Sequence, residues 1–185
     1  MDLSEYVRNL AYEGTEMQAL DDLSKLAELP DMRGKIASAL MGNERPELAG
    51  KSVVVHIAER FLAIDDDEKH PLLMPALLLL GKLSQGSLQS AKCLAVGEVL
   101  DAMIGLVVNY DAQDGEELTA QALTFFQQIV VYKELRPTLM KTNWLLQELV
   151  AISDSSVKPR THKATALSII GSFALEEGSR RKLLK

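Results

Sequence analysis

The sequence predicts an all-α protein built from repeated helical units. Apolar residues recur at spacings of three and four along the 185 residues, as in Leu123, Phe126 and Val130, and this is the period of an α-helix. No sustained apolar–polar alternation indicates a strand, and helical patterns flank the one Asp-Gly pair, Asp114-Gly115. Glycine and proline breaks leave segments of about 10 to 20 residues, the usual length of globular helices.

A repeat is the third observation behind this fold class. The pair Ala-Leu begins at Ala19, Ala76, Ala122 and Ala166, and we number register positions by counting forward from each alanine. Apolar residues recur at positions 4, 7 and 17, and position 14 holds arginine in three of the four copies. The copies are 57, 46 and 44 residues apart, and the last two spacings match helical repeats of roughly 40 to 47 residues. We place an insertion in the first spacing, near Gly42–Gly50 and the long helix after it.

The expected helices follow from the breaks in chain order. A first helix near Leu3–Ala11 ends before Gly14, and later helices begin after a proline or a capping residue. The helices that carry the Ala-Leu pairs recur once in each copy of the repeat. We expect them near Thr15–Leu29, Pro71–Ser84, Glu116–Tyr132 and Arg160–Leu175.

The stretch Arg136–Leu184 resembles an armadillo repeat. It has a helix over Thr138–Ile152, a polar turn Ser153–Lys158, Pro159, the helix from Arg160 and then Glu176-Glu-Gly-Ser-Arg-Arg-Lys-Leu-Leu184. The stretch Leu26–Ile36 has the same form as that ending. The resemblance implies a single domain, an all-α right-handed α-α superhelix of about four partial or complete repeats, with HEAT repeats as the alternative subtype. It also implies that the third helix of each unit, here the one with the Ala-Leu pair, lines a concave groove that binds a partner. Its units are approximately 1–29, 30–84, 86–132 and 133–175, with a trailing first helix over 176–185.

The sequence departs from the asparagine ladder of peptide-binding armadillo proteins. The ladder corresponds to register position 3, which holds Asp22, Leu79, Phe125 and Ile169. The family's groove tryptophans correspond to position −1, which holds Gln18, Pro75, Gln121 and Thr165. The departure argues against clamping of a peptide backbone. It leaves Leu79, Phe125 and Ile169 as a candidate apolar groove for a partner helix, with packing between repeats as the alternative.

Charge is unevenly distributed along the chain. The net charge is −6, with −11 over residues 1–117 and +5 over residues 118–185. Equivalent turns of a solenoid stack on one another, so two acidic turns should form one ridge that steers a basic partner. The alternative is that these charges only keep the protein soluble. The residues of the ridge are Asp65, Asp66, Asp67, Asp114, Glu116 and Glu117. The opposite edge is expected to carry the basic residues Arg33, Arg136, Arg180, Arg181 and Lys182.

Sites of chemistry are not expected. Cys93 occupies an apolar register position and should be a buried thiol. His56 should be a hydrogen-bonded residue at the edge of the core, and Trp144 should pack in the core or on the convex face. The three histidines show no metal-ligand spacing. We therefore predict no catalytic residues, no metal and no cofactor.

The function predicted from the sequence is a non-enzymatic protein–protein interaction module or scaffold. Its partner would be another protein, offering a helix or a basic, apolar segment. The alternatives are an armadillo-like chaperone cofactor that drives nucleotide exchange, and a self-assembling element forming a homo-oligomer. With a pI near 5.1, nucleic acid is not the expected partner. The longest apolar run has nine residues, so we expect no membrane span. The chain has one cysteine, so we expect a reducing compartment, cytoplasmic or nuclear.

Overall fold

The computed structural model describes residues 3–42, 48, 50–65, 68–69, 71–108, 115–142 and 144–175. Its first part contains the elements α1 (Leu3–Asn9), α2 (Glu16–Leu26), α3 (Pro30–Met41), α4 (Val53–His56), the π-helical η2 (Ile57–Phe61), β1 (Ile64–Asp65) and β2 (Glu68–Lys69). Its second part contains α5 (Leu73–Ser84), α6 (Leu88–Leu94), α7 (Gly97–Val108), α8 (Gly115–Val130), the 3₁₀ turn η3 (Lys133–Leu135), α9 (Arg136–Lys141), α10 (Leu145–Asp154) and α11 (Arg160–Ala174).

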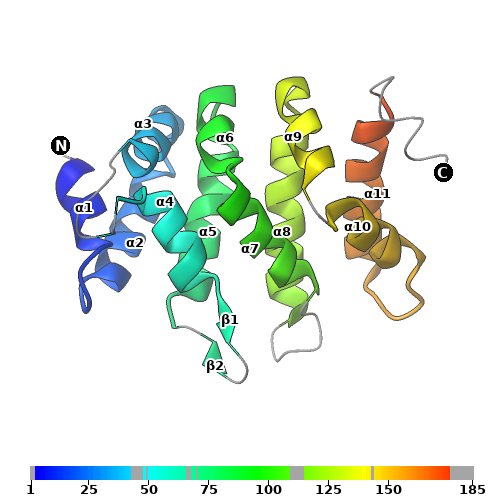
Figure 1. The fold of residues 1–185 in the computed structure, drawn as a ribbon, viewed down its shortest axis with the longest axis horizontal. Coiled ribbons are helices and arrows are strands. Elements are labelled where there is room, and N and C mark those ends of the chain that lie inside the picture. Colours follow the sequence, from blue (N-terminus) through cyan, green and yellow to red (C-terminus); the bar gives the residue numbers. More distant parts are fainter. Residues whose placement is uncertain are drawn as a thin grey trace.

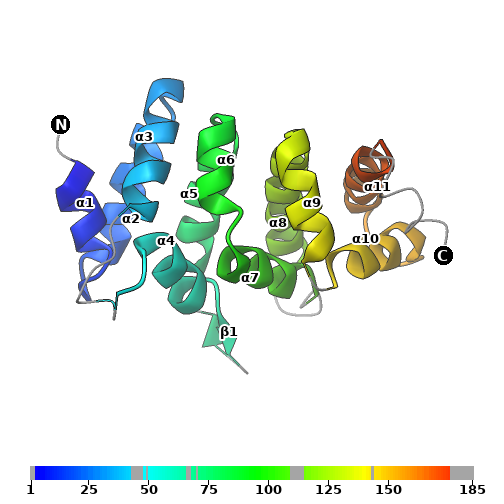
Figure 2. The ribbon, with the colours of Figure 1, turned by 45° about the horizontal axis from the view of Figure 1, so that its top comes forward.

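The helices form three rows that run from one terminus to the other. In Figure 1, α3, α6 and α9 lie along the top, α4, α7 and α10 lie in front, and α2, α5, α8 and α11 lie behind them. Figure 2 keeps this order when the top is turned forward. Along the third row, α2 packs on α5, α5 on α8, and α8 on α11. This row holds the four Ala-Leu pairs, so the sequence register corresponds to the stacking of the molecule.

The register also determines which side chains are buried. Ala19, Ala76, Ala122 and Ala166 at position 0 are all in the core, and one hydrophobic cluster extends from Val7 to Phe173. Position 1 is buried in the first three copies, yet its leucine in α11, Leu167, is 56% exposed. Among the described helices α11 packs chiefly on α8 and α10, and none of them covers Leu167.

The two described arginines at register position 14 cap the third helices that precede them. The Nε of Arg33 donates to the carbonyl of Ala27 at 2.8 Å, and the Nε of Arg136 donates to that of Val130 at 2.9 Å. Both carbonyls are at position 8, where a helix ends and has no further backbone N–H to accept. Since Arg136 is buried, the predicted basic edge is wrong for Arg136, and Arg33 is engaged in the same way. Arg180, Arg181 and Lys182 lie outside the described residues.

Two local predictions differ from the structure. The expected single helix Thr138–Ile152 is split into α9 and α10, because Trp144 adopts the left-handed conformation with φ 67° and ψ −18°. A helix needs negative φ at each residue. The turn after η2 was expected without strands, but Ile64 pairs with Lys69 and Asp65 with Glu68 in a short antiparallel ladder.

Candidate functional site

The third helices share one surface that the rest of the molecule leaves uncovered, and we call it the inner face. It consists of register positions −1, 2, 5 and 6, which lie within about 120° on a helix of 3.6 residues per turn. All of its residues are exposed or half-buried: Gln18, Asp21, Ser24, Lys25, Pro75, Leu78, Gly81, Lys82, Gln121, Thr124, Gln127, Gln128, Thr165, Ser168, Gly171 and Ser172. It is a continuous surface of four helices because each third helix packs directly on the next.

The predicted groove residues are not on this face. Leu79, Phe125 and Ile169 are 0% exposed, and the ring of Phe125 packs edge-on against Phe126 with 5.7 Å between centroids. Position 3 is rotated about 100° from position 2, toward the buried positions 0 and 7. These side chains therefore pack between repeats, and the prediction that they contact a partner is wrong. The exposed position of the third helix is position 2.

The predicted acidic ridge is mostly outside the described residues. Asp66, Asp67 and Asp114 are not described, and only the backbone of Asp65 is described, in β1. Glu116 and Glu117 are exposed in the first turn of α8. The ridge therefore stays a prediction.

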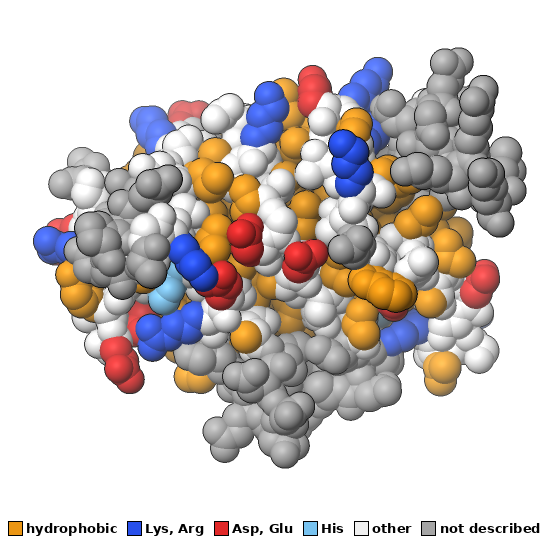
Figure 3. All heavy atoms as spheres, viewed as in Figure 1, with side chains coloured by type: hydrophobic (Ala, Val, Ile, Leu, Met, Phe, Trp, Pro, Cys, Tyr) orange, Lys and Arg blue, Asp and Glu red, His pale blue; other side chains and the backbone are white. Residues whose placement is uncertain are grey.

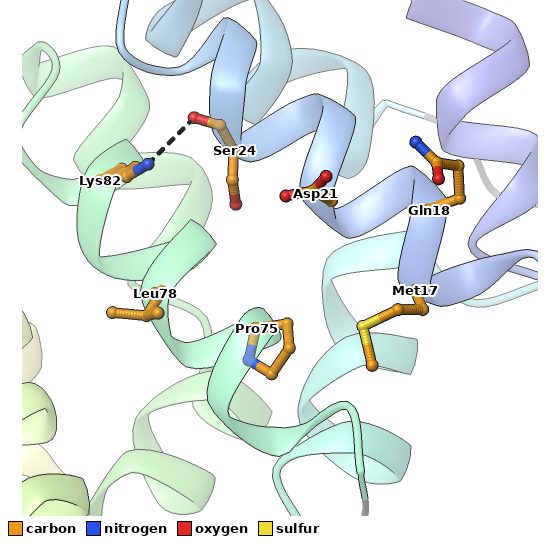
Figure 4. Close-up of a pocket in the computed structure, with 7 residues that line it drawn as sticks. All are labelled: Met17, Gln18, Asp21, Ser24, Pro75, Leu78 and Lys82. Carbon is orange, nitrogen blue, oxygen red and sulfur yellow. Dashed lines mark hydrogen bonds between the residues drawn. The ribbon is translucent and has the colours of Figure 1, made fainter.

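A pocket of about 340 Å³ opens between α2 and α5 on the inner face, and sequence reasoning did not identify it. It is lined by Met17, Gln18, Asp21, Ser24, Pro75, Leu78 and Lys82. Figure 4 shows α5 contributing Pro75, Leu78 and Lys82 across from the α2 residues. The pocket combines apolar walls with the Asp21 carboxylate, the Gln18 amide and the Lys82 ammonium.

Charged groups are concentrated on the α2 side of this pocket. The Nζ of Lys25 lies 2.6 Å from the Oδ2 of Asp21, and this exposed pair raises the pKa of Lys25 through its hydrogen bond and charge interaction with Asp21. Lys82 reaches across from α5, where its Nζ donates to the Ser24 carbonyl at 3.2 Å and lies 3.3 Å from the Oε1 of Glu28. Lys82 therefore links α5 to the last turn of α2 at one end of the pocket.

The inner face over α8 and α11 carries amides and hydroxyls but no charged group. The Nε2 of Gln127 donates to the Oγ of Ser168 at 3.4 Å and joins the two helices. Thr124 and Thr165 donate their hydroxyls to the carbonyls of Ala120 and Thr161 in their own helices. Such hydroxyls and glutamine amides retain further acceptors and donors. This half can hydrogen-bond a polypeptide backbone, whereas the sequence departure at position 3 argued against that mode.

The two histidines in described helices are outside the inner face set. His56 is half-buried, its ring packs edge-on against Phe61 with 5.4 Å between centroids, and its Nε2 has no hydrogen-bond partner among the described residues. The expected hydrogen bond is therefore absent at that atom. His162 is buried near the start of α11. Burial lowers the pKa of both histidines.

Cys93 and Trp144 differ in how well their predicted burial agrees with the structure. Cys93 is buried, as its register position predicted. Trp144 was expected to pack against the molecule, but its side chain is 67% exposed. The expected helix Thr138–Ile152 breaks near this residue, which precedes α10 in the left-handed conformation and is not part of a continuous helix. That prediction was wrong.

Among the residues that the structure describes, no helix is long and apolar enough to cross a bilayer. Within the same ranges no group of three or more His, Cys, Asp or Glu side chains is arranged to hold a metal ion.

The comparisons with known proteins give the fold. No protein-family model matches the chain, and no curated protein matches it. Among solved structures, a designed armadillo repeat protein in complex with the peptide (KR)4 matches with a TM-score of 0.73 and 17% identity, over 100% of this chain and 70% of that one. A computationally designed armadillo repeat protein for modular peptide recognition matches with a TM-score of 0.72 and 16% identity, over 99% and 69% of the two chains.

These similarities show that the chain has an armadillo-like repeat fold, as the register and the resemblance predicted. A third match agrees with this fold. It is an engineered protein with a TM-score of 0.70 and 15% identity, over 100% of this chain and 69% of that one. At such identities the similarity concerns the fold alone. Nothing in these matches supports the chaperone-cofactor alternative.

Proposed function

We propose that this chain is a non-catalytic protein-binding module that holds an extended segment of another protein along its inner face. The observation that carries the proposal is the pocket between α2 and α5, which opens on the same surface as the exposed row of amides and hydroxyls on α8 and α11. A pocket next to a continuous polar surface suits a chain that places one side chain in a recess and extends its backbone over the neighbouring helices.

The pocket sets the expected anchor of the partner. Met17, Pro75 and Leu78 supply apolar surface, and Asp21 supplies a carboxylate at the edge. An apolar side chain would be desolvated against the first three residues, and a neighbouring basic residue would share Asp21 with Lys25, which lies 2.6 Å from that carboxylate. The predicted basic, apolar segment fits this arrangement better than an amphipathic helix, since the apolar stripe proposed for a helix is buried.

The rest of the segment would lie over α8 and α11. Gln121 and Gln128 are half-buried and make no hydrogen bond to another described residue, so each amide has a donor and an acceptor to offer. A backbone that follows these helices would gain hydrogen bonds independent of its own sequence. The pocket would then supply specificity and the glutamines would supply alignment. The designed proteins of the same fold carry titles that describe peptide recognition, which agrees with this mode.

Selection from a random peptide library tests the proposal. The full chain is immobilised, linear peptides are enriched, and the affinities of synthetic copies are measured by fluorescence anisotropy. We expect Leu78→Glu, which places a charge beside the pocket, to weaken binding at least tenfold, about 1.4 kcal/mol. Leu78 is 39% exposed, so this change should leave the fold intact, as a circular dichroism melt would verify.

The matched control is Val108→Glu. Val108 is 51% exposed at the end of α7 and is not one of the inner-face residues, and the change in charge is the same. Its affinity should equal that of the original chain. If peptides lose affinity for Val108→Glu and keep it for Leu78→Glu, the inner face is not the binding surface.

Self-association is a second candidate, favoured by one exposed leucine in the middle of α11 and another at its C-cap. Leu167 and Leu175 are 56% and 68% exposed there, and the equivalents of Leu167 in earlier copies are covered by the next unit. Sedimentation equilibrium over a range of concentrations tests this candidate. A mass that rises with concentration in the original chain and not in Leu167→Glu would support it, and a constant monomer mass would exclude it.

A further inference from the structure

Trp144 combines two unusual properties at the start of α10. Within the described ranges it is the one residue other than glycine with positive φ. This conformation places Cβ close to the following carbonyl and is unfavourable for a bulky side chain. Most residues held in such a conformation are fixed by surrounding contacts, and they cluster at functional sites.

Packing does not explain the conformation. The side chain is 67% exposed, and its indole N–H donates to no described residue. Its backbone carbonyl accepts from the N–H of Glu148 at 2.9 Å and so opens the helix, a role that any residue can perform. The fold therefore holds an indole at the surface in an unfavourable conformation without burying it. Tryptophan is among the residues enriched at the hot spots of protein interfaces.

The charges around Trp144 indicate the chemistry of a partner. Its own helix α10 packs against α7. Together these two helices contain four acidic residues and no lysine or arginine: Glu98, Asp101, Glu148 and Asp154. Glu98 and Asp101 are exposed one turn apart on α7, and neither forms an ion pair with another described residue. Figure 3 shows acidic side chains over α7 in the middle of this face, with apolar side chains beside them over the start of α10.

Basic groups belong to the neighbouring elements. Lys141 is exposed at the end of α9, and Arg60 is exposed in η2. Arg60 lies 3.6 Å from Glu16 and over the ring of Phe61, so α7 and α10 themselves contribute acidic groups only. Arginine suits the site, because its planar guanidinium stacks on an indole face and pairs with carboxylates at the same time.

We propose that Trp144, Glu98 and Asp101 form a second docking surface, which binds an arginine-bearing segment of another protein on the face opposite the inner face. The guanidinium stacks on the indole while the two carboxylates of α7 attract its charge. This surface is independent of the inner-face proposal, because it shares no residue with the pocket.

The chain's single tryptophan makes the test direct, because intrinsic fluorescence reports on Trp144 alone. Peptides of alternating glycine and arginine, glycine and lysine, or glycine and glutamate are titrated into the full chain at low ionic strength. We expect a saturable change in emission with the arginine peptide, a several-fold weaker affinity for the lysine peptide and no change with the glutamate peptide. Equal affinity for arginine and lysine would indicate charge attraction alone and would overturn the proposal.

Variants locate the binding. Trp144→Gly relieves the backbone conformation and should melt no lower than the original chain, so lost affinity in it is not unfolding. Measured by anisotropy of a labelled arginine peptide, Trp144→Gly and the pair Glu98→Gln with Asp101→Asn should each bind about tenfold more weakly. Glu5→Gln with Asp31→Asn, which removes the same charge from exposed positions on α1 and α3, should bind unchanged, as should Leu78→Glu. Loss of affinity in Leu78→Glu with retention in Trp144→Gly would overturn the proposal.

Discussion

The two halves of the inner face have the same helical architecture and different chemistry. Over α2 and α5 the surface is charged and recessed, with Asp21, Lys25 and Lys82 around a pocket of about 340 Å³. Over α8 and α11 the same register positions hold glutamine, threonine, serine and glycine. The repeat therefore constrains the positions that face the core and leaves the exposed positions free to differ. The binding proposed for the inner face would depend on those exposed positions.

The largest effect on stability is expected from the buried side chains at register position 3, which pack between repeats in both halves. Phe125→Ala should lower the free energy of unfolding by about 3–5 kcal/mol, and Leu79→Ala by about 2–5 kcal/mol, because each empties a fully buried site. Urea unfolding followed by circular dichroism measures both. A loss below about 1 kcal/mol in either variant, the range of surface substitutions, would mean that position 3 faces solvent in that half.

The next largest effect on the free energy of unfolding is expected from the arginine caps, which should differ between the two halves. Arg136 is buried and donates to the Val130 carbonyl at 2.9 Å, so Arg136→Met should lower the unfolding free energy by about 1.5–3 kcal/mol. Arg33→Met should have a smaller effect, since Arg33 is half-buried and water can replace its bond to Ala27. The same urea titrations give both values. Equal losses would contradict the difference in burial.

Acid should destabilise the protein through its histidines. Burial lowers the pKa of His162 and His56 below the ordinary value of 6.5, so between these values the unfolded chain binds more protons than the folded one. Stability is full above about pH 6.5 and falls as the pH drops toward the folded-state pKa. Melting temperature across this range measures the effect. His162→Gln should reduce the dependence of the melting temperature on pH in this range. An unchanged dependence would assign the effect to other groups.

The smallest effect is expected from the surface links between helices. The ion pair of Lys82 with Glu28 spans 3.3 Å between exposed or half-exposed side chains, and such pairs contribute about 0–1 kcal/mol. A double-mutant cycle with Lys82→Met and Glu28→Gln gives its coupling energy. The Gln127–Ser168 link over α8 and α11 should be as weak. A coupling well above 1 kcal/mol would show that the α2–α5 half is held by charge.

Much of the fold was predictable from the sequence because burial follows the helical period. The Ala-Leu register predicted the third helices and the burial of Cys93, and position 14 marked arginines whose repeated spacing had a structural cause. The pattern was interpreted as a basic surface edge. A sequence pattern alone does not distinguish an arginine that donates to the last carbonyls of a helix from one that is exposed to solvent. The break at Trp144 was also missed, since no glycine or proline marks it.

The candidate site was less predictable than the fold. The groove was assigned to position 3 by resemblance, but a one-position difference on a helix is a rotation of about 100° and separates Leu78 at the pocket from Leu79 in the core. The pocket itself depends on how α5 is placed against α2. Met17 and Pro75 are 58 positions apart in the sequence, and no local pattern connects them.

The most direct test of the central claim is a methyl NMR spectrum of the chain labelled at its methionine ε-methyl groups, recorded with and without a selected peptide. Met17 lines the pocket on α2, whereas Met32 and Met140 lie on α3 and α9 in another row of helices. If the inner face holds the partner, the Met17 signal shifts on binding and those of Met32 and Met140 stay in place. A shift of Met32 or Met140 with Met17 unchanged would contradict the account.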